Sequence, residues 1–192
     1  MSLPYDNVVN HAITRFAGKE NPTLLDFNHL KNLSQVQQGL VTYEAQGKGM
    51  TFEQLINEAH DSSRLARHMT ANGDPRPSQH CDCHAIIAGK DPRAIPMRGI
   101  MAWAKMRIDF PANGAWLPHN TAAKPQMPRH LSNAVPHSRI HRKGYYQWLS
   151  TLIDQSRIKD DKSLALALRE IRFKLETCTF PSFVMLRADQ LP

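Results

Sequence analysis

The segment from Asn72 to Ser78, with the sequence NGDPRPS, strongly limits what this chain of 192 residues can fold into. Two prolines that follow an Asn-Gly turn cannot continue a helix, so any preceding helix must end there. Apolar residues recur at helical spacing before the segment, whereas short apolar runs bounded by glycine or proline follow it. We therefore expect an α+β protein that is mostly α-helical. Its expected parts are a helical region over residues 1–75, a core over 76–156 and a C-terminal helix over 157–192 that packs on the core in one compact unit.

The first region contains one clear helix start, the capping box Thr51-Phe52-Glu53-Gln54, whose first and last side chains can satisfy free backbone amides. The apolar stripe that follows predicts one helix that continues to Asn72. Apolar residues at positions 8–16 and 24–36 predict further helices. The histidines of this region are interpreted as surface or packing residues: His11, His29, His60 and His68.

The elements expected after the break alternate between strand and helix. Periodicity and turn residues predict, in order, a strand at 83–88, a helix at 96–106, a strand at 115–117, an ordered proline-rich loop at 118–136, and helices at 138–153 and 163–177.

Positive charge is concentrated in the middle of the sequence. Between His80 and Trp148 the chain has ten Lys and Arg residues against three Asp and no Glu, whereas the rest of the chain is neutral. The same segment contains six of the ten histidines. A basic, histidine-rich segment predicts a site for a polyanion such as a nucleic acid, although an uneven solvated surface would have the same composition.

Three other classes of protein are disfavoured. No apolar run approaches the roughly 20 residues that a membrane-spanning helix needs. Residues 1–6 lack the basic and apolar regions of a secretory signal. Cys81, Cys83 and Cys178 are a poor basis for a disulfide framework, so we expect a reducing compartment.

Two histidines near the end of the basic segment have the spacing of metal ligands. His137 and His141 are four residues apart at the start of a predicted helix, so they would lie on one face, about one turn apart, and could hold one ion. This spacing also arises by chance in a chain with ten histidines. His84, in the first predicted strand, is placed to be a third ligand.

Two strands followed by a helix with such a histidine pair are the layout of the ββα-metal (His-Asn-His) nucleases. The run from Cys83 to Ala94 (CHAIIAGKDPRA) closely resembles the opening motif of the AHH family of bacterial toxin nucleases, named for its Ala-His-His signature. Residues 113–118 (NGAWLP) and 137–141 (HSRIH, followed by two tyrosines) match later motifs in the expected order. The resemblance covers about residues 80–153. It implies a ββα-metal core with two short strands, wrapped by N- and C-terminal helices.

The resemblance also assigns roles to individual residues. His84 matches the first histidine of the signature and, with His137 and His141, would hold one divalent metal ion. Asn113 matches the family asparagine that braces the loop between the strands, although it could simply begin an Asn-Gly turn. The residues expected to contact nucleic-acid phosphates, any of which could instead belong to a solvated surface, are Lys90, Arg93, Arg139, Arg142 and Lys143.

Ala85 is the main departure from the family pattern. It stands where the signature has its second histidine, the general base that activates water, and alanine cannot accept a proton. One hypothesis is that Ala85 is an engineered substitution that disarms a toxic nuclease. The other is a natural variant in which His80, Asp82 or His119 supplies the base.

Imidazole ligands suit zinc, nickel or other transition metals such as manganese better than magnesium, although the resemblance leaves magnesium open. A rival interpretation places a structural zinc ion on His80-Cys81-Asp82-Cys83-His84. Alternation along a strand would put both cysteines on the face opposite His84, which favours cysteines that are small buried residues.

The function implied by the resemblance is a metal-dependent endonuclease that hydrolyses DNA. Such toxins act as antibacterial effectors: they are made in the bacterial cytoplasm, delivered by a secretion machine (a type VI-like system) into the cytoplasm of a target cell, and neutralised in the producer by an immunity protein. The alternatives are an RNase or a non-catalytic nucleic-acid-binding module with a structural metal site, which Ala85 would favour.

Overall fold

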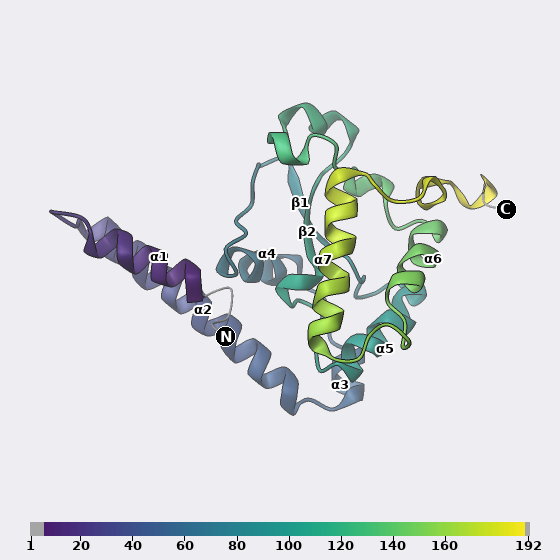
Figure 1. Cartoon of the computed structure of the whole chain (residues 1–192), viewed down its shortest axis with the longest axis horizontal. Helices are drawn as coiled ribbons and strands as arrows, with labels where there is room; N and C mark the ends of the chain where they lie inside the picture. Colours follow the sequence, from purple (N-terminus) through teal and green to yellow (C-terminus); the bar gives the residue numbers. More distant parts are fainter. Residues whose placement is uncertain (1–5, 191–192) are drawn as a thin grey trace.

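The computed structural model describes residues 6–190 and confirms a mostly helical α+β fold with one small sheet. The prediction that the chain lacks a secretory signal rests mainly on residues 1–5, which lie outside the described residues. Figure 1 shows a body built around the two strands, from which α1 and much of α2 extend as an arm. The elements are α1 (Asp6–Ala17), α2 (Leu24–Gly49), α3 (Phe52–Ile56), α4 (Ser62–Ala71), β1 (Cys81–Ala85), α5 (Ile95–Trp103), β2 (Gly114–Pro118), α6 (Lys143–Leu152) and α7 (Asp161–Thr177).

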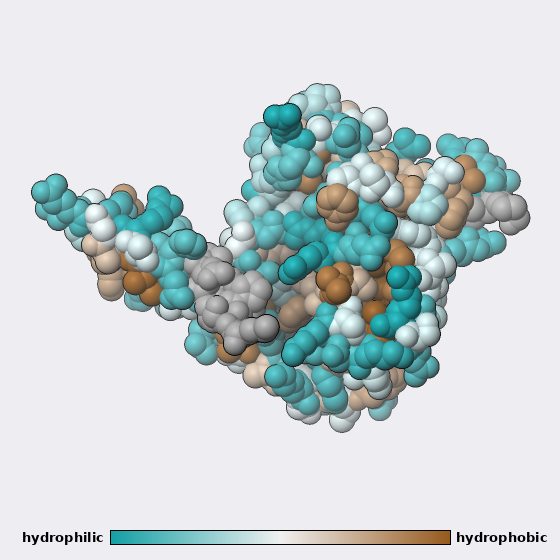
Figure 2. Space-filling model, in the orientation of Figure 1, coloured by the Kyte–Doolittle hydropathy of each residue, from teal (hydrophilic) through white to brown (hydrophobic). Residues whose placement is uncertain are grey.

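The arm is a pair of packed helices whose contact with the body lies in the second half of α2. The Phe16 ring of α1 lies 6.3 Å from that of Phe27 in α2, whereas Leu40 and Tyr43 are buried where α2 meets the body. Leu25, near the tip of the arm, is 80% exposed. Figure 2 shows hydrophobic side chains on the outer part of the arm, among hydrophilic ones. No described helix is both long enough and apolar enough to span a membrane.

The sheet consists of β1 and β2, which pair antiparallel with Ala85 opposite Gly114. Alternation along β1 places Asp82 and His84 on one face, and Cys83 and Ala85 on the other. The second face packs against α4, because Cys83 Sγ lies 3.6 Å from Sδ of Met69 in that helix. Both predicted strands are confirmed with shifted bounds.

β1 ends earlier than predicted because the chain after Ala85 turns toward Asn113, the residue before β2. The backbone N–H of Ile86 donates to the carbonyl of Asn113 at 2.8 Å, and that of Ile87 donates to the Asn113 side chain at 2.8 Å. The apolar residues after Ala85 therefore pack as a buried loop, not as strand.

The single helix predicted from Thr51 to Asn72 is wrong, because the chain forms two helices there. The capping box at Thr51 is confirmed, but α3 ends at Ile56, with Asn57 as its C-cap. Asp61 then caps α4, accepting hydrogen bonds from the backbone N–H groups of Ser63 and Arg64. An N-cap residue inside an apolar stripe thus marks the start of a second helix.

The prediction that His137 and His141 lie one turn apart on one helix is also wrong. His137 begins a single 3₁₀ turn that ends at Arg139, Ile140 is extended, and His141 has a φ of +57°. A left-handed residue cannot continue a right-handed helix, so α6 begins only at Lys143. The histidines are brought together by an irregular segment.

Candidate metal centre

Three histidines from two separate segments converge beside the sheet. One ring nitrogen from each of His84, His137 and His141 lies within 4.8 Å of the others. Their ring centroids are 4.9–5.7 Å apart. His84 is fully buried in β1, and the other two are partly buried in the segment before α6. A fully buried imidazole beside two others needs a ligand or a hydrogen-bond partner on each nitrogen.

The hydrogen bonds of His84 leave one of its nitrogens aimed at this centre. The hydroxyl of Tyr145, in α6, donates to the carbonyl of Ile86 at 2.7 Å, so it accepts from Nε2–H of His84 at 3.1 Å. Nδ1 of His84 therefore carries a lone pair. It is buried and has no partner within residues 6–190. An unpartnered lone pair on a buried imidazole fits a metal ion.

His137 is oriented by an acidic partner from the same strand as His84. Its Nδ1 donates to Oδ2 of Asp82 at 2.8 Å, which leaves Nε2 free to bind an ion. Burial alone would raise the pKa of Asp82. Hydrogen bonds from His137 and His119 together outweigh that effect, so the pKa of Asp82 lies below its usual value. Asp82 is thus held as a carboxylate behind a ligating imidazole, a common second partner of metal-bound histidine.

His141 is oriented by a hydroxyl. Its Nδ1 lies 3.0 Å from the Tyr146 hydroxyl, and burial together with the charge of Asp91 raises the pKa of that hydroxyl. The contact occupies Nδ1, so Nε2 is the nitrogen of His141 that remains for an ion. Arg93 braces the same group: it donates to the His141 carbonyl at 3.1 Å and stacks over the Tyr146 ring.

His84 and His141 favour the neutral state that a ligand must have. Burial and the charges of the other two histidines hold the pKa of His84 well below its usual value. Burial, with repulsion from His137, lowers the pKa of His141 to about 4. Three neutral nitrogen donors and remaining open positions can hold one transition-metal ion that still binds a ligand.

The two nitrogens of His119 and both oxygens of Asp82 are already engaged. Nδ1 of His119 lies 2.5 Å from Oδ1 of Asp82, and its Nε2 lies 3.1 Å from the carbonyl of Gln79. The other oxygen of Asp82 accepts from His137. His80 lies just before β1, with its Nε2 3.3 Å from the Gln79 amide. Of the residues that the sequence offered as substitute bases, His119 therefore has no free acceptor nitrogen, and each oxygen of Asp82 already accepts one hydrogen bond.

Asn113 lies at the entrance of β2 and is fully buried. Its side-chain oxygen accepts from the N–H of Ile87 at 2.8 Å, and its amide donates to the carbonyls of Ile87 at 3.1 Å and Ile108 at 2.8 Å. It therefore ties the loop after β1 to the segment before β2, and does more than begin a turn.

Ala85 points away from the three histidines. It shares the sheet face of Cys83, is only 6% exposed and belongs to the hydrophobic core. A larger side chain here must fit against α4 or bend around the end of the strand, because Met69 already packs against the facing Gly114.

The basic residues predicted at the site differ in their surroundings. Arg93 pairs with Asp91 at 2.6 Å besides bracing His141. Arg142 donates to the carbonyl of Met185, which holds the C-terminal segment on α6. Three side chains remain exposed to solvent near the centre in sequence, and these are Lys90, Arg139 and Lys143.

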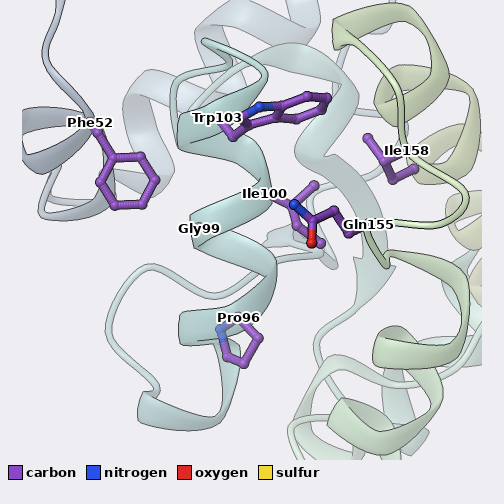
Figure 3. Close-up of a pocket in the computed structure, with 7 residues that line it drawn as sticks. All are labelled: Phe52, Pro96, Gly99, Ile100, Trp103, Gln155 and Ile158. Carbon is purple, nitrogen blue, oxygen red and sulfur yellow. The ribbon is translucent and has the colours of Figure 1, made fainter.

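Neither the cysteines of β1 nor the cavity beside α5 forms part of this centre. Cys81 packs against Met127 and Cys83 against Met69, on the sheet face opposite His84. A cavity of about 410 Å³ lies elsewhere, and Figure 3 shows its lining from α3, α5 and the segment after α6, with Phe52 and Trp103 among the residues. That lining is largely apolar, which does not suit a phosphate.

Sequence reasoning missed the residues that orient the ligands. The matching motifs contain Tyr145, Tyr146 and Asp91, but they assign no role to them. The signal in the sequence was the pair of adjacent tyrosines soon after His141, because a hydroxyl can orient an imidazole.

The comparisons with known proteins agree with this geometry. A family model described as a nuclease family of the HNH/ENDO VII superfamily with conserved AHH matches residues 65–174, more than half of the chain. That span runs from α4 into α7 and contains all three histidines of the centre. No curated protein and no solved structure matches the chain. The chain belongs to the AHH nuclease family of the HNH/ENDO VII superfamily.

Proposed function

We propose that this protein is a metal-dependent endonuclease that hydrolyses phosphodiester bonds of DNA. The observation that carries the proposal is the unpartnered, buried Nδ1 of His84, which faces two further imidazoles whose free nitrogens are fixed by Asp82 and Tyr146. When bound there, one divalent cation supplies stabilisation of the negative charge that builds on the phosphate. The exposed Lys90, Arg139 and Lys143 would bind neighbouring phosphates, as the basic charge of this region supports.

In this proposal the protein is an antibacterial effector. It would be made in the bacterial cytoplasm, delivered by a secretion machine into a target cell, and neutralised in the producer by an immunity protein. The family membership supports this role. Ala85 removes the proton acceptor of the signature, so the chain as it stands would cleave more slowly than its Ala85→His variant.

Plasmid nicking tests the proposal. We expect cleavage that requires a divalent metal such as magnesium, manganese, zinc or nickel, none in EDTA, and faster cleavage by Ala85→His, which restores the proton acceptor of the signature. His137→Ala should abolish cleavage, whereas the exposed His130→Ala should not change it. If the chain and Ala85→His both fold and cut RNA but not DNA, the proposed DNA substrate is wrong. If neither nucleic acid is cut, the enzyme proposal fails.

A second candidate is a non-catalytic nucleic-acid-binding module with a structural metal, which Ala85 favours. Chelation separates the two, because removal of a structural ion lowers the melting temperature greatly, whereas removal of a catalytic ion mainly removes activity.

A further inference from the structure

His60, which lies outside the matched family span, forms a histidine–carboxylate pair with Asp109, which lies inside it. It stands in the linker between α3 and α4, with Nδ1 2.5 Å from Oδ1 of the fully buried Asp109. The other oxygen of Asp109 accepts from Nε of Arg64 at 2.7 Å and from the backbone N–H of Asp61 at 3.0 Å. The carboxylate is therefore held in place from three directions.

This arrangement fixes the tautomer of His60. A carboxylate engaged by a guanidinium and a backbone amide acts as an acceptor, so Nδ1 of His60 carries the hydrogen. Nε2 then carries a lone pair and has no hydrogen-bond partner in the described part of the chain. The side chain is 22% exposed, so water can reach it. His60 thus has the free acceptor that His119 lacks.

His60 lies next to the helix that Ala85 faces. Ala85 faces α4, and His60 directly precedes that helix. A Cβ on Gly89 would lie only 2.4 Å from Cβ of His60, so the loop that follows β1 passes directly against this residue. The side chain of Asn113 links the same loop to the carbonyl of Ile108, the residue before Asp109.

The loop that His60 contacts at Gly89 connects the surroundings of two of the three histidines. It begins directly after β1, which carries His84, and continues to Arg93, whose side chain donates to the His141 carbonyl at 3.1 Å. His60 thus lies outside the ligand set but beside this loop, and a proton acceptor for a bound substrate has to be such a residue.

We propose that His60, oriented by Asp109, is the general base of this chain and takes the role of the histidine absent at position 85. The proposal rests on the nuclease function proposed above. Nε2 of His60 takes a proton from water while an electron pair of the water oxygen forms the new bond to phosphorus. The bond from phosphorus to the leaving oxygen breaks, its electron pair stays on that oxygen, and solvent supplies the proton that the oxygen takes up.

The tautomer of His60 can be measured in the chain without metal or substrate. Long-range ¹H–¹⁵N NMR of the imidazole, assigned by comparison with His60→Gln, distinguishes a protonated Nδ1 from a protonated Nε2 at pH values where the ring is neutral. We expect the hydrogen on Nδ1, and Asp109→Asn should shift the population toward Nε2–H. A neutral His60 with its hydrogen on Nε2 would overturn the proposal.

Cleavage by a set of four proteins tests the role itself: the chain, His60→Ala, Ala85→His and the double variant. We expect His60→Ala to lower cleavage by roughly 10²-fold in the chain, with partial rescue by added imidazole. The loss should be at least tenfold smaller beside Ala85→His, because a second acceptor is then present. The exposed His29→Gln, a matched histidine change on α2, should leave cleavage unchanged.

The outcomes separate the two proposals. Equal losses in both backgrounds without rescue by imidazole would show that His60 is only structural. Cleavage by Ala85→His, with none by the chain, would keep the nuclease function and reject His60. Absence of metal-dependent cleavage in all four folded proteins would reject the nuclease function and, with it, the role of His60. Melting temperatures check folding, and His60→Gln replaces His60→Ala if the latter unfolds.

Discussion

At the scale of single residues, the centre depends on polar side chains that hold its imidazoles in one orientation. Tyr145, Tyr146 and Asp82 each engage one nitrogen of a different histidine, so the other nitrogen is presented to the centre. Such partners restrict both the ring orientation and the tautomer of a metal ligand. Asn113 serves the backbone in the same way, because it holds the loop that follows β1.

Asn113→Ala should destabilise the protein severely. The change leaves the N–H and carbonyl of Ile87 and the carbonyl of Ile108 without their side-chain partner in a buried place. Each buried group that loses its partner costs about 1–3 kcal/mol. Urea unfolding should therefore show a loss well above that of the control Asn133→Ala, an exposed asparagine. Equal small losses in the two variants would show that Asn113 does not brace the loop.

The sequence predicted the ligand histidines but not their partners, and the reason is physical. His84, His137 and His141 stand in motifs that a family resemblance makes visible, and the structure brings them together. The partner Tyr145 acts through contacts that depend on the packing of α6 against the loop after β1. The His60–Asp109 pair spans 49 positions and has no local pattern at all.

At the scale of secondary structure, local signals were reliable where a cap agreed with an apolar stripe. The helix predicted at 163–177 is confirmed as α7, with Asp160 as its N-cap. The predictions of continuous helices across Asp61 and His141 are wrong, because contacts with residues far away in sequence determine the backbone conformation at both positions. Asp61 donates its N–H to Asp109, and His141 is held by the Arg93 side chain.

The buried His68 of α4 should make stability depend on pH. Burial lowers its pKa below 6.5, and the charges of Arg64 and Arg67 add to this, against the opposing effects of a hydrogen bond to the Asp109 carbonyl and of the Asp109 charge. Below pH 6.5 the unfolded chain then binds more protons than the folded one, so stability falls as pH falls from about 6.5 toward the lower, folded-state pKa.

Urea unfolding from pH 7.5 to 5 measures this effect. We expect the chain to lose more stability over that range than His68→Gln, which cannot titrate there. Glutamine can still donate to the Asp109 carbonyl, so it preserves the contact. Parallel pH profiles for the two proteins would contradict a lowered pKa for His68.

At the scale of the whole molecule, the metal centre joins segments that are far apart in sequence. His84 belongs to the sheet, whereas His137 and His141 precede α6, which packs beside α5 and the C-terminal segment. An ion bound by all three would cross-link the body of the protein, and the arm of α1 and α2 extends away from it (Figure 1). Composition and family motifs predicted a helical surround for a small sheet, but not the projecting arm, because nothing local distinguishes an exposed helix pair from a packed one.

Addition of zinc or nickel should raise the thermal stability of the metal-free protein. At a concentration of 100 times Kd the gain is about 2.7 kcal/mol. For a chain of this size that corresponds to roughly 5–10 °C in melting temperature. His137→Ala should lose most of the shift, which EDTA should reverse, whereas His130→Ala should retain it. A shift of the same size in His137→Ala would place the ion elsewhere.

The left-handed backbone of His141 has an energetic consequence. An L-residue with a side chain pays about 1–2 kcal/mol for that conformation, and glycine does not. Glycine at this position would therefore relieve the cost and stabilise the fold, but it would remove one of the three imidazoles. The protein thus holds local backbone strain at a candidate metal ligand.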